Sequence, residues 1–119
     1  MAKILVIDDS SFQRGMIRRA LQGLGHEILE AENGISALEI ISANKVDFIF
    51  LDLIMPKMDG FETLEKLREM GNKIPVVVLT SDVQILVHQR CLSLGALNVL
   101  TKPPKKGELE KVLGELLPR

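Results

Sequence analysis

The sequence predicts a doubly wound α/β domain, in which helices cover both faces of a five-stranded parallel sheet. Short apolar runs alternate five times with longer amphipathic segments, an order typical of consecutive strand–helix units. Three of the runs are apolar throughout, as strands buried on both faces must be. Crossovers between parallel strands are nearly always right-handed, so four of them can cover both faces only if the strand order reverses within the sheet.

The five expected strands differ in their patterns. The second run alternates between apolar and polar residues, which suits an edge strand. Asn98 interrupts the fifth run. We expect strands at residues 4–7, 26–30, 48–51, 76–79 and 97–100.

The segments between and after the strands carry apolar residues at the period of an amphipathic helix. Capping patterns precede the first four, at Ser10-x-x-Gln13, Asn33-Gly34, Asp59-Gly60 and Ser81-x-x-Gln84. In chain order, the expected apolar faces consist of Phe12, Met16, Ile17, Ala20, Leu21 and Leu24; Ile35, Leu38 and Ile41; Leu64 and Leu67; Leu86, Val87 and Leu94; and Leu109, Val112, Leu113, Leu116 and Leu117.

Length and composition fit a single soluble domain at residues 1–119. The net charge of −1 gives no electrostatic case for a nucleic-acid or membrane partner. No apolar stretch approaches the roughly 20 residues of a membrane span, and no signal-peptide pattern is present, so we expect a cytoplasmic protein. The one cysteine, Cys91, is expected to be buried, and His26 and His88 show no metal-ligand spacing.

Polar residues follow four of the five apolar runs. Asp8 and Asp9 follow the first run and Asp52 the third, while Thr80 follows the fourth and Lys102 comes two residues after the fifth. Because parallel strands end at the same edge of a sheet, we expect these side chains to converge there. That edge, at the point where the strand order reverses, is where ligands bind in open α/β sheets.

The expected cluster holds three carboxylates and one ammonium group. Three neighbouring carboxylates cannot all stay ionised unaided, and the pKa of one would rise. A divalent cation removes the conflict, and oxygen ligands without Cys or His select Mg²⁺ or Mn²⁺. Lys102 and Thr80 could then donate to an anion bound beside the metal. A single aspartate after a strand is more often a turn or cap, but the set at four strand ends predicts a site.

The sequence resembles the response-regulator receiver domain of two-component signalling over essentially all 119 residues. The motifs that carry the resemblance are Asp8-Asp9, FLDLIMPKMDG at 50–60, VVLTSD at 77–82 and Lys102-Pro103. The resemblance implies a flavodoxin-like sheet in the order 2-1-3-4-5 and a cis peptide bond before Pro103.

The resemblance also implies a role for each site residue. Asp52 would accept a phosphoryl group, and Asp8, Asp9, Asp52 and the main-chain carbonyl of Ile54 would hold Mg²⁺. Thr80 and Lys102 would contact the phosphoryl group.

A histidine kinase or phosphotransfer domain would supply the phosphoryl group, and Met16, Ile17 and Pro103 are candidate apolar contacts for it. Phosphorylation would switch the surface of the fourth helix, fifth strand and fifth helix for an effector protein in trans. The chain would act on no external substrate.

Two positions depart from the family pattern. Val99 stands where the family usually has an aromatic ring that moves inward with the switch hydroxyl, and the chain has no tyrosine. The output would therefore be coupled weakly, or through the loop after Thr80 and the fourth helix. Ile54 and Asp82 occupy positions that tune hydrolysis of the phosphoryl group, and apolar Ile54 cannot orient an attacking water, so we expect slow self-hydrolysis.

Two other functions stay open. One is a pseudo-receiver, an interaction module that works without phosphorylation, which Val99 favours. The other is a Mg²⁺-dependent phosphohydrolase with an aspartyl nucleophile, although such enzymes often have a general acid where this chain has Ile54. A nucleotide-binding fold fits poorly, because neither a G-x-G-x-x-G motif nor a P-loop follows the first strand.

Overall fold

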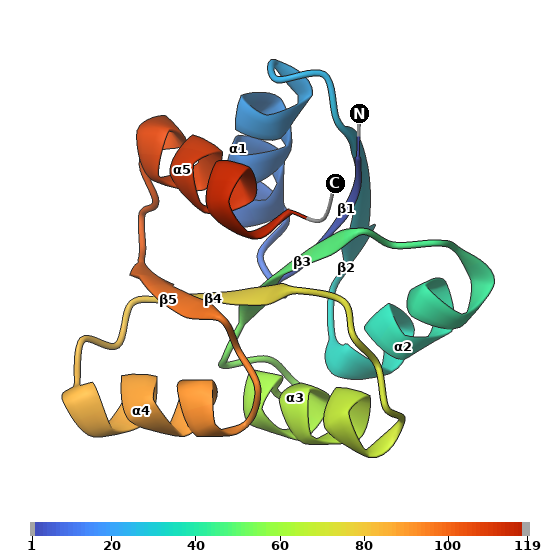
Figure 1. The fold of residues 1–119 in the computed structure, drawn as a ribbon, viewed down its shortest axis with the longest axis vertical. Coiled ribbons are helices and arrows are strands. Elements are labelled where there is room, and N and C mark those ends of the chain that lie inside the picture. The colour runs from blue at the N-terminus through green and yellow to red at the C-terminus, as the bar shows by residue number, and fades with distance from the viewer. Residues whose placement is uncertain (1, 118–119) are drawn as a thin grey trace.

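The computed structural model describes residues 2–117 and has the predicted α/β fold. Five parallel strands pair in the order β2-β1-β3-β4-β5, and a helix follows each strand (Figure 1). The elements are β1 (Lys3–Ile7), α1 (Ser11–Gln22), β2 (Glu27–Ala31), α2 (Gly34–Ala43), β3 (Phe48–Asp52), α3 (Gly60–Glu69), β4 (Val76–Thr80), α4 (Ile85–Ser93), β5 (Asn98–Thr101) and α5 (Lys106–Leu116).

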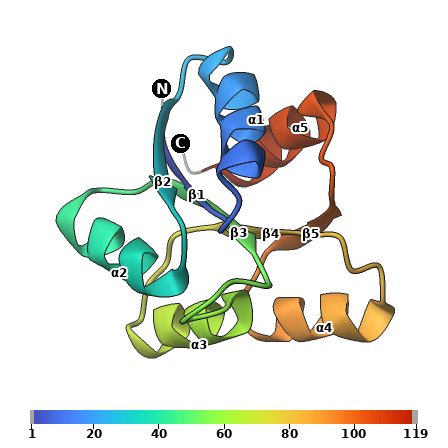
Figure 2. The same ribbon diagram turned by 180° about the vertical axis from the view of Figure 1, so that it is seen from behind.

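The helices form two layers, one on each face of the sheet. Helices α1 and α5 cover one face, and α2, α3 and α4 cover the other, as the opposed views of Figures 1 and 2 show. Successive strand residues point to opposite faces, so β1 and β3 contribute to two separate cores. Phe48 and Phe50 face α1 and α5, whereas Ile49 and Leu51 face the other three helices. The continuously apolar runs are therefore buried on both sides, as predicted.

The strand register brings the polar strand ends together. Ile7 pairs with Leu51, and Asp52 pairs with Leu79. Asp8 therefore lies one position beyond β1 at the level of Asp52, next to the reversal of strand order between β1 and β3. In β4 and β5 the last pair is Thr80 with Thr101, so Lys102 leaves the sheet at the same edge.

Four helix expectations were wrong, all at helix starts. Helix α4 begins at Ile85 instead of after Ser81, because the chain after β4 bends at Ser81 and Asp82 Oδ1 accepts from the Gln84 amide at 2.9 Å. Phe12, Leu86 and Ile35, expected on apolar faces, are 68%, 77% and 46% exposed. All three lie in the first turn of a helix, next to the edge at which the strands end, where the sheet offers no surface to cover them.

Other sequence expectations are confirmed. Residues 98–101 form a strand despite Asn98, β2 is an edge strand, and Cys91 is fully buried. Among the described residues, no helix combines the length and apolar character that crossing a membrane requires.

Candidate functional site

Three aspartates from two neighbouring strands meet at the carboxyl edge of the sheet. Asp8 and Asp9 follow β1, and Asp52 is the last residue of β3. Asp8 and Asp52 are buried, at 2% and 8% exposed, whereas Asp9 is exposed. One carboxylate oxygen from each residue lies within 4.8 Å of the others. The structure thus brings the three predicted acids into one cluster, open to solvent on the Asp9 side.

Lys102 enters this cluster from β5 and bridges its two buried acids. Its Nζ lies 2.7 Å from Asp8 Oδ2 and 3.1 Å from Asp52 Oδ1. The Lys102 amide donates to the carbonyl oxygen of Thr80 at 2.8 Å, which fixes the start of the loop after β5. The next peptide bond, Lys102–Pro103, is cis. Lys102 is therefore positioned at both its main chain and its side chain.

The cluster holds more negative than positive charge. Burial raises the pKa of Asp52, the neighbouring Asp8 carboxylate raises it further, and Lys102 offsets this only in part. Burial alone would lower the pKa of Lys102, but the hydrogen bond to Asp8 and the charge of Asp52 outweigh it, so this pKa is raised. Three carboxylates against one ammonium leave a site that a hard divalent cation fits.

A tight loop carries the chain from Asp52 to α3. The Gly60 amide donates to the Leu53 carbonyl at 2.8 Å. A Cβ at Gly60 would lie 2.4 Å from the carbonyl oxygen of Asp52, so only glycine allows this approach. Within the loop, Ile54 is 78% exposed, and the proposed role of its main-chain carbonyl stays a prediction.

Thr80 is buried at the end of β4, and its hydroxyl has a partner in the following turn. The amide of Asp82 donates to Thr80 Oγ1 at 3.1 Å, and the carbonyl oxygen of Asp82 lies 2.6 Å from His88 Nε2 on α4. Val99 is half-buried in β5, where it pairs with Val78 and packs on the core beneath α4. Thr80 is thus linked to α4 by polar contacts, whereas Val99 contributes only an aliphatic contact.

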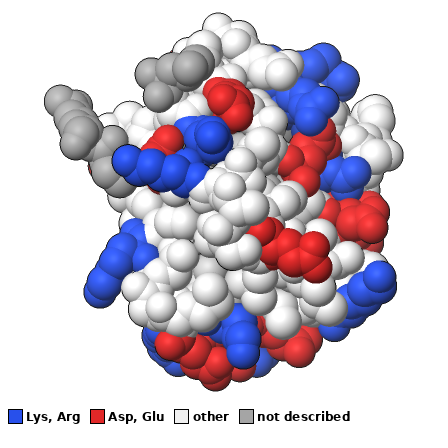
Figure 3. Space-filling view, turned by 90° about the vertical axis from the view of Figure 1, so that its right-hand side faces the viewer, with Lys and Arg blue, Asp and Glu red and all other residues white. Residues whose placement is uncertain are grey.

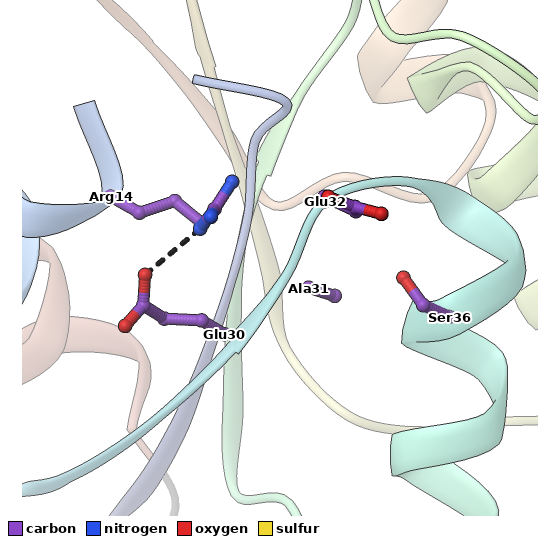
Figure 4. A pocket seen from close by; sticks show the side chains of 5 residues that line it. All are labelled: Arg14, Glu30, Ala31, Glu32 and Ser36. Carbon is purple, nitrogen blue, oxygen red and sulfur yellow. Dashed lines mark hydrogen bonds and ion pairs between the residues drawn. The ribbon is translucent and has the colours of Figure 1, made fainter. Parts of the chain in front are cut away.

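Sequence reasoning missed one residue at this edge, Arg14. From α1, its guanidinium donates to the main-chain carbonyl of Asp8 and pairs with Glu30 on β2 at 2.8 Å. A hollow of about 300 Å³ lies beside this pair, lined by Arg14, Glu30, Ala31, Glu32 and Ser36 (Figure 4). The sequence did offer one signal for Arg14. It is a basic residue one turn into the helix that follows Asp8-Asp9, and the next strand carries the acidic residue Glu30.

The surface in Figure 3 shows no field of one sign. On this face lysines and arginines lie next to acidic residues, with uncharged atoms between them. This agrees with the net charge of −1.

Comparison with known proteins agrees with this geometry. The family model of the response regulator receiver domain matches residues 4–114. Among solved structures, the chemotaxis protein CheY4 of Vibrio cholerae superimposes with a TM-score of 0.91 and 34% sequence identity, covering 98% of this chain and 99% of that one.

Two curated relatives are longer proteins. The response regulator MprA of a Mycobacterium species is 36% identical over 117 residues, which is 98% of this chain and 51% of the relative. The sensor histidine kinase RcsC of Salmonella typhi is 34% identical over 110 residues, which is 92% of this chain but 12% of the relative. The chain thus spans about half or less of these relatives. Its fold, its acidic edge and the extent of the match together show that it belongs to the response regulator receiver domain family of two-component signalling.

Proposed function

We propose that the chain is a phosphoacceptor in two-component phosphorelay signalling, phosphorylated on Asp52 in a Mg²⁺-dependent reaction. The observation that carries the proposal is the bridge that Lys102 makes between buried Asp8 and Asp52, inside a cluster of three acids. Such an arrangement holds one reactive carboxylate in place and surrounds it with groups that neutralise charge. Phosphoryl transfer depends chiefly on those two properties.

In the proposed reaction, a carboxylate oxygen of Asp52 attacks the phosphorus of a phosphohistidine or a small acyl phosphate. The new bond joins that oxygen to phosphorus, and the bond from phosphorus to the donor breaks with its electron pair leaving on the donor. Lys102, already paired with Asp52, faces the charge that accumulates on the phosphoryl oxygens. Thr80 can turn its hydroxyl from the Asp82 amide towards those oxygens.

Asp8, Asp9 and Asp52, with the main-chain carbonyl of Ile54, are the groups that would hold the metal. A Mg²⁺ ion held by these residues would supply positive charge that offsets the negative charge of the carboxylates and of the phosphoryl group. The cluster of three carboxylate oxygens within 4.8 Å of one another supports this assignment. Burial raises the pKa of Asp52, the Asp8 carboxylate raises it further, and Lys102 offsets this only in part.

We further propose that the output runs from Thr80 to α4 and does not use an aromatic ring at position 99. Movement of the Thr80 hydroxyl would free the Asp82 amide, and the carbonyl of Asp82 contacts His88 on α4. The surface formed by α4, β5 and α5 would then change for an effector protein in trans.

The phosphoryl donor would be a histidine kinase or phosphotransfer domain that covers the acidic edge. Ile17, one candidate contact for it, is excluded because it is 2% exposed. Pro103, another candidate, is exposed next to Lys102. Phe12 and Ile54 are 68% and 78% exposed, and we propose these three residues as contacts.

A phosphorylation-independent interaction module is the second candidate, favoured by Val99. One experiment separates the two. The protein is incubated with acetyl phosphate with and without Mg²⁺, and its mass is measured. We expect a gain of one phosphoryl group only with Mg²⁺, lost in Asp52→Ala and kept in Asp47→Ala, which removes an acid from the other end of β3. No gain in the wild type, or a gain that survives Asp52→Ala, would overturn the proposal.

A further inference from the structure

We propose that Arg14 is a positioning residue for the metal site: it fixes the peptide between Asp8 and Asp9 and thereby sets where the Asp9 carboxylate lies. The inference rests on the proposed function and names a residue that the function above does not use. It is drawn from the contacts that join α1, β2 and the end of β1.

Arg14 is itself held firmly. Its side chain is 15% exposed, and its Nε donates to Glu30 Oε1 at 2.8 Å (Figure 4). A second guanidinium nitrogen donates to the main-chain carbonyl of Asp8. Glu30 is shared with Arg18, one helical turn further along α1. A planar guanidinium can serve both partners at once, which a lysine ammonium does not reproduce.

Every polar group of Asp8 has a hydrogen-bond partner. Its amide donates to the Ala31 carbonyl at 3.0 Å, its Oδ1 accepts from the Ser10 amide at 2.9 Å and its Oδ2 accepts from Lys102. Arg14 occupies the remaining group, the carbonyl oxygen. This last contact restrains the peptide plane that leads to Asp9.

Asp9 has no such restraint of its own. It is exposed, and within residues 2–117 no hydrogen bond to its carboxylate is present. Its distance from Asp8 and Asp52 therefore depends on the orientation of the preceding peptide. If Arg14 is removed, that peptide can rotate, and the three oxygens no longer stay within 4.8 Å of one another.

The positioning role of Arg14 and its charge predict opposite effects on Mg²⁺ affinity, so a binding measurement can separate them. Arg14 is a cation near a cation site, so the loss of its charge alone would tighten Mg²⁺ binding. The loss of its positioning role would weaken binding. Arg18 provides a matched control, because it pairs with the same Glu30 from the same helix but has no contact with Asp8 among the described residues.

The test is calorimetric titration with Mg²⁺, since the chain contains no Trp or Tyr to report binding by fluorescence. We expect Arg14→Ala to raise the Kd for Mg²⁺ about 10-fold, the lower end for residues that orient metal ligands, and Arg18→Ala to change it less than about twofold. Arg14→Met keeps the side-chain length and is expected to match Arg14→Ala, and it replaces that variant if circular dichroism shows a folding defect. Excess Mg²⁺ should restore the yield of phosphoprotein in either Arg14 variant.

Equal or tighter Mg²⁺ binding by the Arg14 variants, or an equal loss in Arg18→Ala, would overturn the inference. So would a loss of phosphoprotein that excess Mg²⁺ fails to restore. The proposed function fails separately: if the wild type binds no Mg²⁺ and accepts no phosphoryl group, both fall. If the wild type does both and the Arg14 and Arg18 variants behave alike, only the role of Arg14 is refuted.

Discussion

Asp47 and Asp52 lie at opposite ends of β3, five residues apart, and the structure uses them differently. Asp47, before the strand, accepts from the Lys3 amide at 2.8 Å and donates its own amide to the Lys3 carbonyl at 2.8 Å. Asp52, at the other end, faces two more carboxylates and one ammonium. The first arrangement continues the pairing of β1 with β3 by one step. The second places three carboxylates beside one ammonium group, so part of their negative charge is not neutralised.

The surroundings of each acid decide its role. Asp47 has a neutral main-chain donor, so its interaction is complete within the fold. Asp52 is buried beside Asp8, which raises its pKa, and Lys102 compensates only in part. The excess of negative charge around Asp52 is what a divalent cation can neutralise.

The largest expected effect comes from removing the cation on the Asp52 side. Lys102→Met should slow phosphorylation by acetyl phosphate about 10²–10³-fold, the usual cost of losing one group that stabilises a developing negative charge. Lys45→Met, which removes an exposed lysine near Asp47, should leave the rate within about twofold. Time courses followed by mass spectrometry would measure both rates. A comparable loss of phosphorylation rate in Lys102→Met and Lys45→Met would contradict the difference between the two ends of β3.

Stability should change in opposite directions at the two acids. Asp47→Ala leaves the Lys3 amide without its partner and should lower the free energy of unfolding by about 1 kcal/mol. Asp52→Asn keeps the side-chain shape but removes a buried charge next to Asp8, and should raise it by about 1 kcal/mol at neutral pH. Urea denaturation of the Mg²⁺-free protein would measure both changes.

The Asp52 effect should also depend on pH. The pKa of Asp52 in the folded protein is raised above the ordinary 3.8. As the pH rises, the unfolded chain therefore loses the Asp52 proton before the folded protein does. The wild type then loses stability relative to Asp52→Asn. The gain from the substitution should therefore be complete above the raised pKa and should disappear below about pH 4. A constant gain from acid to neutral pH would contradict the charge-based explanation.

The smallest expected effect concerns the lifetime of the phosphoryl group on Asp52. Ile54 is exposed and apolar, so it cannot orient a water molecule towards the acyl phosphate. Ile54→Asn should speed hydrolysis by a few-fold, on the order of the gain from orienting one reactant by one hydrogen bond. Loss of the phosphoryl group from the purified protein would be timed. A wild-type half-life of seconds would refute the expectation of slow hydrolysis.

Much of the fold could be predicted from the sequence because its signals are local. Apolar periodicity separated strands from helices, and parallel strands necessarily share one edge, so Asp8, Asp52 and Lys102 could be placed together without coordinates. The start of α4 could not, because the turn at Asp82 competes with the capping pattern at Ser81. The exposure of Phe12 depends on how far its helix extends beyond the sheet, which periodicity does not encode.

The difference between Asp47 and Asp52 was only partly readable. Both are aspartates next to the same apolar run, but only Asp52 follows it, at the edge where the other polar strand ends meet. Its role as the phosphoryl acceptor came from the resemblance alone. The contact of Arg14 with Asp8 was not readable, since it depends on side-chain conformation and on an ion pair to Glu30, 16 residues away on another element. Contacts of this kind, between side chains of different elements, leave no periodic signal.

Locating the phosphoryl group would show directly whether Asp52 is the phosphoacceptor. Protein treated with acetyl phosphate and Mg²⁺ would be reduced with borohydride, which converts an aspartyl phosphate to homoserine, and its peptides would be mapped by mass spectrometry. We expect homoserine at position 52 alone, and none when Mg²⁺ is omitted. Modification at Asp8, Asp9 or Asp47, or modification of Asp52 without a divalent cation, would contradict it.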